Sequence, residues 1–364
     1  AAATSRAMEE YRWGGMTGAN QSTPQRLKAG KLPAGHLRRM LADIQRDDPR
    51  VLLGPGVGED AALISFGATT LIAKSDPVTF ASDLAGWYAV QVNANDVAAC
   101  GGEPKWFLAT VLLPEGAPAE TAEHIFTQLR DAAAGLGVTL VGGHTEITVG
   151  MPRPIICGTM LGEVNASGAI HTSGASPGDV IILTKGIAIE GTAILAREAG
   201  ERLSSSGLDA AIIERAAGFL FDPGISVVPD SRAARAAHGV TAMHDPTEGG
   251  LATALAELAE ASGIGIEIDP GAVHVFAETT AICGALGVDP WGLIASGALL
   301  LAASPAEADG VLRSLRSAGI DAAVIGAATA PGNGLVILDG DSRRPIPVFE
   351  RDEVARILES EWRD

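Results

Sequence analysis

The chain has 364 residues, a net charge of −18, 47% hydrophobic residues and 19% charged residues. This length exceeds what one hydrophobic core usually fills, so we expect two domains. The negative charge would repel a phosphate backbone, which argues against nucleic acid as a partner. No stretch approaches 18 uninterrupted apolar residues, so we also expect no membrane span.

The three cysteines, Cys100, Cys157 and Cys283, are far apart and show no C-x-x-C spacing. This spacing predicts neither a disulfide framework nor a zinc site, and it is consistent with a cytoplasmic protein. The first residues lack the apolar centre of a signal peptide, and we expect 1–30 to form a flexible arm.

The first half of the chain alternates strands and helices, which predicts an α/β or α+β domain. Helical spacing is found at 35–44, 83–100 and 119–137, and strand patterns at 69–76, 106–114, 138–143 and 153–164. Polar residues interrupt the apolar helix at 83–100, at Gln91, Asn93, Asn95 and Asp96. Taken alone, these residues predict a stripe that faces solvent.

The segment SGASPGD at 173–179 is the clearest linker, and a second α/β unit follows it. We expect strands at 180–186, 264–268 and 297–303, helices at 190–200, 208–219, 225–237, 276–286 and 352–362, a strand, turn and helix over 241–263, and a helix and strand over 305–328. The predicted domains are therefore 31–172 and 173–345, followed by a tail at 346–364.

An acidic glycine loop, GPGVGEDAALI, lies at 54–64. Glycine lets a backbone approach a ligand closely, and two adjacent acids suit a hard cation better than a bare phosphate. The loop is therefore either a magnesium-dependent phosphate loop or a turn with two solvated acids. The chain contains no P-loop, no G-x-G-x-x-G fingerprint and no H-E-x-x-H motif.

Further acids lie where strands end and helices begin, which is where α/β proteins place their ligands. They are Glu59, Asp60, Asp76, Asp96, Glu146, Asp245 and Glu248. Each could be a helix cap or a surface charge, and Asp245 could cap the helix after it. Converging carboxylates would repel one another unless cations neutralise them, so the series predicts magnesium that bridges nucleotide phosphates.

The ordered motifs GEDAA, KSD, NANDVAACGGEP, VGGHTE, SPGDVIILTKG and HDPTEGGLATALAELAEASG resemble the AIR-synthetase-like superfamily. The segments DPTEGGLATAL and VGGHTEI are most similar to its hydrogenase maturation (HypE) branch. The resemblance implies an N-terminal α/β domain that forms a dimeric β-barrel with a second copy, a C-terminal α/β domain packed against it, and a cleft for ATP and Mg²⁺.

The resemblance also implies roles for individual residues. The metal ligands would be Asp60, Asp76, Asp96 and Glu146, and the reacting end would be formed by Asp245, Thr247 and Glu248. The nucleotide would contact Gly56, Gly58, Glu59, Asp60, Asn93, Asp96, Gly142, Gly143, Gly249 and Gly250.

Several positions depart from the family pattern. His144 stands where relatives often have an acid, and Glu248 replaces an arginine common in the HypE branch. HypE proteins carry a C-terminal cysteine that accepts a carbamoyl group, whereas no cysteine follows Cys283 here. We therefore expect no reaction on the chain's own tail.

The resemblance predicts a homodimeric enzyme that uses ATP and magnesium to phosphorylate an oxygen of a small amide or carbonyl substrate. Two alternatives remain open. One is a small-molecule kinase of the thiamine-phosphate kinase type. The other is a non-catalytic nucleotide-binding maturation or scaffold protein whose protein partner supplies the acceptor group.

Overall fold

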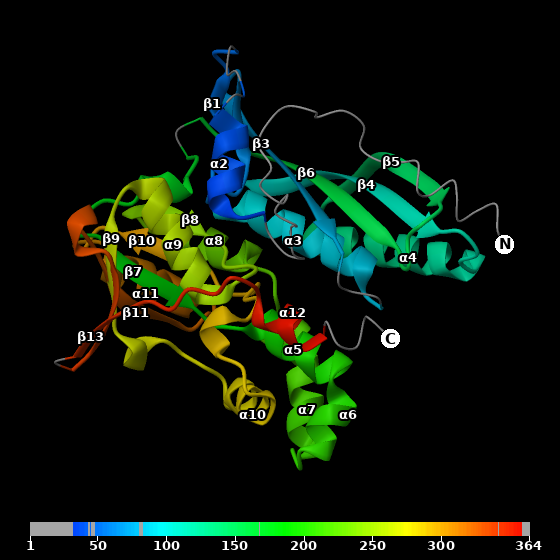
Figure 1. Cartoon of the computed structure of the whole chain (residues 1–364). Coiled ribbons are helices and arrows are strands. Elements are labelled where there is room, and N and C mark those ends of the chain that lie inside the picture. Colours follow the sequence, from blue (N-terminus) through cyan, green and yellow to red (C-terminus); the bar gives the residue numbers. More distant parts are fainter. Residues whose placement is uncertain are drawn as a thin grey trace, which may run out of the picture.

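The computed structural model of the chain describes residues 32–42, 44, 48–79, 83–166, 168–340 and 342–358. The arm predicted for 1–30 and the end of the tail helix, 359–362, lie outside the described residues. Two separate sheets are present (Figure 1), one of six strands in the order β1-β2-β3-β6-β4-β5 and one of seven in the order β13-β12-β9-β11-β7-β10-β8. The mixed α/β fold with two sheets confirms the predicted fold class; the exact domain boundaries stay a prediction.

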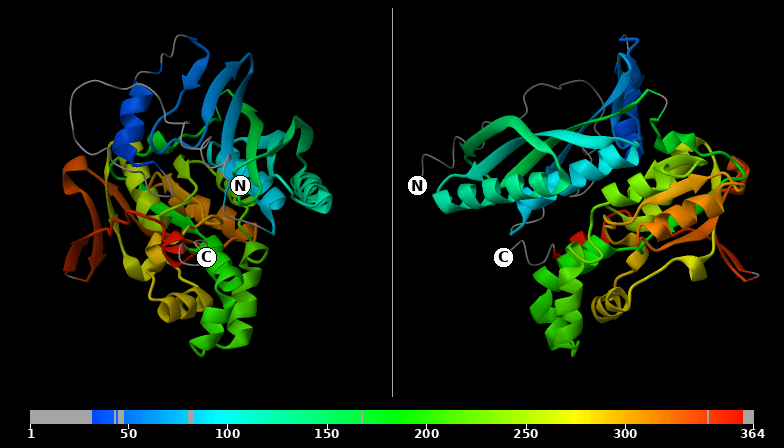
Figure 2. Two further views of the ribbon diagram at one scale, coloured as in Figure 1. Left: turned by 45° about the vertical axis from the view of Figure 1, so that its right-hand side comes forward. Right: turned by 180° about the vertical axis from the view of Figure 1, so that it is seen from behind.

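The N-terminal unit is a sheet with two helices against one face (Figure 2). Its strands are β1 (Val51–Leu53), β2 (Ala62–Phe66), β3 (Thr69–Val78), β4 (Glu103–Pro114), β5 (Thr139–Thr148) and β6 (Ile155–Asn165), and its helices are α2 (Ala34–Ala42), α3 (Ala85–Ala99) and α4 (Ala119–Leu136). Buried residues alternate along β6, which is the pattern of a strand with one covered face. The covering helices are α3 and α4.

The expectation of a solvent-facing polar stripe on α3 is wrong. Gln91, Asn93, Asn95 and Asp96 are all buried, because α3 lies between its own sheet and the second unit. Asn95 joins the two units directly: its amide donates to the carbonyl of Ile225 (2.8 Å), and its carbonyl accepts from the N–H of Val227 (2.9 Å). Asn95 therefore satisfies buried main-chain groups at the interface between the units.

The C-terminal unit is built on the seven-stranded sheet. Its strands are β7 (Val180–Thr184), β8 (Val240–His244), β9 (Gly265–Ile268), β10 (Leu300–Ala303), β11 (Ala322–Thr329), β12 (Leu335–Asp339) and β13 (Ser342–Pro345). Its helices are α5 (Ile189–Glu198), α6 (Gly200–Ser205), α7 (Ala210–Ala217), α8 (Val228–Arg235), α9 (Gly250–Ser262), α10 (Ala277–Leu286), α11 (Ala308–Ser317) and α12 (Glu353–Leu358). The predicted helices of this half are present, most of them somewhat shorter than expected.

Helices cover both faces of this second sheet. Ile181 and Leu183 of β7 belong to a core shared with α5 and α9, whereas Ile182 between them belongs to a separate core with α8 and α11. Successive residues of a strand point to opposite faces, so β7 is buried on both sides. Such strands read as continuous apolar runs, which is why VIILT was recognisable in the sequence.

Within the described part of the chain, no helix is both long and apolar enough to cross a membrane. The longest helix, α4, has 18 residues and includes Glu120, Glu123, Arg130 and Asp131.

Candidate active site

The glycine loop at 54–60 brings the N-terminal unit against α9 of the second unit. Gly58 has a φ of +81°, which glycine adopts readily and other residues rarely. A Cβ atom at this position would lie 2.9 Å from the main-chain carbonyl oxygen of Glu257. Both the backbone conformation and the close approach therefore require glycine here, and the loop delivers Asp60 to the interface.

We expect Gly58→Ala to lower the free energy of unfolding by about 2–4 kcal/mol, because a left-handed alanine is strained and its methyl group would overlap main chain. Gly116→Ala is the matched control, since Gly116 has a φ of +86° and no atom within 4 Å of a built Cβ. That variant should lose only the conformational part, about 1 kcal/mol. Urea unfolding of both variants measures the difference, and equal losses would show that the contact with Glu257 is unimportant.

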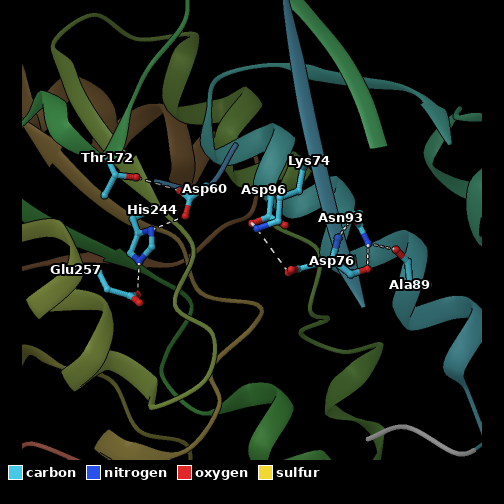
Figure 3. A network of polar contacts seen from close by, with 9 residues as sticks. All are labelled: Asp60, Lys74, Asp76, Ala89, Asn93, Asp96, Thr172, His244 and Glu257. Atoms are coloured by element: carbon cyan, nitrogen blue, oxygen red, sulfur yellow. Dashed lines mark hydrogen bonds and ion pairs between the residues drawn. The ribbon is translucent and has the colours of Figure 1, made fainter. Parts of the chain in front are cut away.

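Asp60 is buried and bonded to the second unit (Figure 3). One carboxylate oxygen accepts from the hydroxyl of Thr172 (3.2 Å), and the other lies 2.7 Å from Nδ1 of His244. Nε2 of His244 lies 3.1 Å from Oε2 of Glu257. Burial alone would lower the pKa of His244, but Asp60 and Glu257 outweigh it and raise that pKa well above its usual value. A protonated His244 therefore donates to both carboxylates.

Asp96 and Asp76 share a second protein cation, Lys74 (Figure 3). Its ammonium nitrogen lies 3.0 Å from Oδ1 of Asp96 and 3.6 Å from Oδ2 of Asp76. Burial would lower the pKa of Lys74, but Asp96 and then Asp76 outweigh it, so the pKa is raised. Asn93 fixes this end of β3, because its carbonyl oxygen accepts from the N–H of Asp76 (2.9 Å).

Asp245 follows β8 and is also buried. Its Oδ1 has no hydrogen-bond partner among the described residues. Burial first, and then the nearby Asp60, raise the pKa of Asp245 to about 8. Asp60, His244 and Asp245 each offer one ligand atom, and these atoms lie within 4.8 Å of one another. The structure thus brings together Asp60, Asp76, Asp96 and Asp245, as the sequence predicted. The two protein cations that pair with these acids, Lys74 and His244, were not predicted from the sequence.

Glu146 does not join this group within one chain. The strand predicted to end at 143 continues as β5 to Thr148, and β5 is the outer strand of its sheet. Asp76 is level with Gly143 on β5, but β6 and β4 lie between their strands. Glu146 and His144 are exposed, 3.3 Å apart. Gly143 is needed for pairing with β4, because a Cβ at this position would lie 2.0 Å from the carbonyl oxygen of Ala109. Gly142 and Gly143 are exposed, like His144 and Glu146.

A cavity of about 720 Å³ lies between the two units, next to these carboxylates. Of the predicted residues, Asp76, Thr247, Glu248 and Gly249 line it, whereas Asp60, Asp96 and Asp245 are buried and do not. Segment 346–355, which the sequence assigned to a tail, forms part of the wall. Asp352 in this segment accepts a hydrogen bond from the N–H of Gly249 (2.7 Å).

Glu190 is a cavity residue that the sequence prediction missed. It lies in the first turn of α5, is only 5% exposed, and its Oε2 has no hydrogen-bond partner in the described structure. Burial raises the pKa of Glu190 to about 7; Ser296 opposes this by a hydrogen bond, and Glu248 and Asp352 add to it. A signal for Glu190 was available in the sequence, because Glu190 follows the buried strand β7 and a turn, and the other candidate acids were chosen by the same criterion.

The raised pKa of Glu190 makes stability depend on pH. The folded state holds this proton up to a pH of about 7, whereas the ordinary value is 4.5, so the favourable contribution is complete below 4.5 and is lost as pH rises through 7. We expect wild type to lose about 3 kcal/mol of unfolding free energy relative to Glu190→Gln as the pH rises from 4.5 to 8.5. Chemical denaturation across this range measures it. Glu201→Gln, at an exposed position on α6, should track wild type; a Glu190→Gln curve parallel to wild type would contradict the prediction.

Comparisons with known proteins agree with one another. The family models described as AIR synthase related protein, N-terminal domain and C-terminal domain match residues 58–164 and 176–339. A putative hydrogenase expression/formation protein of Methanocaldococcus jannaschii is 30% identical over 307 residues, which cover 82% of this chain and 88% of that protein. Carbamoyl dehydratase HypE of Cupriavidus necator is 31% identical over 307 residues, covering 80% and 84%. A crystal structure of hydrogenase maturation protein HypE in complex with ATP superposes with a TM-score of 0.65 at 24% identity, covering 90% of this chain and 97% of that chain.

Proposed function

Because the chain belongs to the AIR synthase related family, as its motif series predicted, we propose that it uses ATP and Mg²⁺ to phosphorylate an oxygen atom of a small amide- or carbonyl-type substrate. The family and the HypE relatives support the part of this proposal that makes the chain an ATP-dependent enzyme. The magnesium ion and the substrate class are our proposal. The observation that carries it is the convergence of Asp60, Asp76, Asp96 and Asp245 beside the cavity.

The donor groups fit a divalent cation. Asp245 has a buried oxygen without a hydrogen-bond partner among the described residues, and a bound cation would satisfy it. Asp76 is the predicted metal ligand that reaches the cavity, with its side chain 43% exposed. Carboxylate oxygens are the ligands that Mg²⁺ prefers. We propose that Asp76 and Asp245 hold Mg²⁺, which would neutralise phosphate charge, while Asp60 and Asp96 remain paired with His244 and Lys74.

The chain's own residues position the reactants. The substrate oxygen would form a bond to the γ-phosphorus as the bond to the β,γ-bridging oxygen breaks and ADP leaves. Such a transfer depends mainly on alignment and on neutralising charge. Thr247 and Glu248 line the cavity in the loop that precedes α9, and we assign them to the reacting end. The same loop is held by Asp352 through Gly249, which orients it.

The test is ATP turnover by the purified chain with and without Mg²⁺, over a panel of amide and alcohol substrates. We expect Asp76→Asn and Asp245→Asn each to lower turnover at least about a hundredfold, since each removes a carboxylate that we propose as a Mg²⁺ ligand. Asp131→Asn, at an exposed ion pair with Arg130, is the control. Binding of ATP without any Mg²⁺-dependent turnover would instead support the scaffold alternative, and phosphate that stays on the product would support the kinase alternative.

We further propose a homodimer formed through the N-terminal sheet. Strand β5 is the outer strand of that sheet, and all its residues but Thr148 are exposed. Its exposed apolar residues include Val141 and Ile147. An exposed apolar edge strand is a typical pairing surface for a second copy. Light scattering of the purified chain tests this, and a monomer would overturn it.

A further inference from the structure

The cavity between the two units is strongly acidic. Among the described residues, six carboxylates and one basic side chain, that of Arg351, line it. Two of the six, Asp76 and Glu257, are already paired with Lys74 and His244. The acids are Asp76, Glu190, Glu248, Glu257, Glu350 and Asp352. ATP is an anion, and one bound Mg²⁺ needs only a few carboxylate ligands, so the nucleotide does not explain this number of acids. A second, cationic ligand would account for them.

Three of these acids form a cluster on the wall of the second unit, which we call the Glu190 cluster: Glu190, Glu248 and Asp352. The negative charges of Glu248 and Asp352 both act on Glu190. Asp352 already accepts from the N–H groups of Gly249 and Val354, at 2.7 and 2.8 Å. Glu190 differs, because its Oε2 is buried without a donor in the described structure, although the residue lines the cavity. Buried carboxylate oxygens are normally hydrogen-bonded, and a ligand in the cavity would supply the donor that Glu190 Oε2 lacks in the described structure.

The surroundings favour an organic cation over a hydrated metal ion. Tyr88, Val92, Ile194 and Phe349 line the same cavity as the Glu190 cluster. Magnesium retains several waters and prefers an all-oxygen environment, which these apolar walls do not offer. Aromatic faces and carboxylates together are instead suited to an ammonium or guanidinium group on an apolar stem.

We propose that the substrate of this enzyme carries a protonated amine or a guanidinium group, which the Glu190 cluster binds. This inference rests on the proposed function, because it concerns the substrate end of the same cavity. Glu190 supplies the acceptor, and Glu248 and Asp352 add negative charge beside it. Thr247 is next to Glu248 in the chain, so the cationic group would anchor the substrate close to the reacting end.

The experiment is an NMR titration of the full chain, with and without Mg²⁺ and the non-hydrolysable nucleotide AMP-PCP. The probes are 1-aminobutane and agmatine, with 1-butanol and butyrate as the neutral and anionic counterparts. We expect the two cations to bind at least tenfold more tightly than 1-butanol, and butyrate more weakly still. Glu190→Gln should lower the affinity for the cations about tenfold to a hundredfold, the effect of losing one charge-assisted hydrogen bond. The affinity for AMP-PCP should change by less than about threefold.

Glu350→Gln is the matched control, because Glu350 lines the cavity but is exposed. Glu248→Gln is a second test at a half-buried position, in case Glu190→Gln folds poorly. Equal binding of 1-aminobutane and 1-butanol to wild type overturns the inference, and so does an equal loss in Glu190→Gln and Glu350→Gln. Wild type that fails to bind AMP-PCP with Mg²⁺ overturns the proposed function instead, and the two failures are therefore distinguishable.

Discussion

Replacing Lys74 with methionine should lower the free energy of unfolding by about 3–5 kcal/mol. Lys74 and Asp96 form a buried ion pair at 3.0 Å, with side chains 19% and 7% exposed. Methionine retains most of the side-chain volume, so the variant removes the positive charge rather than the packing. Asp96 would be left without a cation in a site where burial already raises its pKa. Unfolding in urea at pH 7 measures the loss.

Lys105→Met is the matched control for this variant. Lys105 and Glu163 also form an ion pair, but their nitrogen and oxygen atoms are 4.0 Å apart and both side chains are more than 40% exposed. Exposed pairs contribute little, so this variant should lose at most about 1 kcal/mol. The double variant Lys74→Met, Asp96→Asn should recover part of the loss, because it no longer buries an unpaired charge. If Lys74→Met is no more harmful than Lys105→Met, Lys74 is not the counter-ion of Asp96.

The acid series illustrates what local pattern could and could not reveal. Asp60, Asp76, Asp96 and Asp245 were predicted to converge because each follows a strand or lies on a helix next to one, and they do. The sequence suggested magnesium as the cation that would neutralise them. Their partners Lys74 and His244 were present in the motifs KSD and HDPTEGG. The i, i+2 spacing places Lys74 on the same face of β3 as Asp76, but nothing local shows that Lys74 also pairs with Asp96 or that His244 pairs with Asp60.

Long-range packing explains the remaining differences. The two glycines at 142 and 143 resembled the end of a strand, whereas the backbone at Gly143 in fact allows β5 to lie close to β4 and to continue. The polar residues of α3 resembled a solvent face because a sequence does not reveal that a second unit covers them. Glu190 and Asp352 line one cavity although they are far apart in the sequence. Tertiary contacts of this kind leave no local signal.

The second large effect is expected at His244. We expect His244→Phe to lower the free energy of unfolding by about 3–5 kcal/mol at pH 7, because it leaves Asp60 and Glu257 facing each other without a cation. Phenylalanine keeps the ring and the apolar packing, so the charge is the main change. The loss should also weaken the contact between the two units, since Asp60 belongs to the first and His244 to the second.

Arg130→Met is the control, because Arg130 forms an ion pair with Asp131 at 2.8 Å, but with side chains 68% and 61% exposed. Its stability should stay within about 1 kcal/mol of wild type. Combining His244→Phe with Asp60→Asn should restore stability relative to His244→Phe alone, because the unpaired carboxylate is removed. If the two losses simply add, Asp60 and His244 are not coupled. In that case, the glycine loop is held by the contact of Gly58 with α9 and by the hydrogen bond from Thr172 to Asp60 rather than by an ion pair.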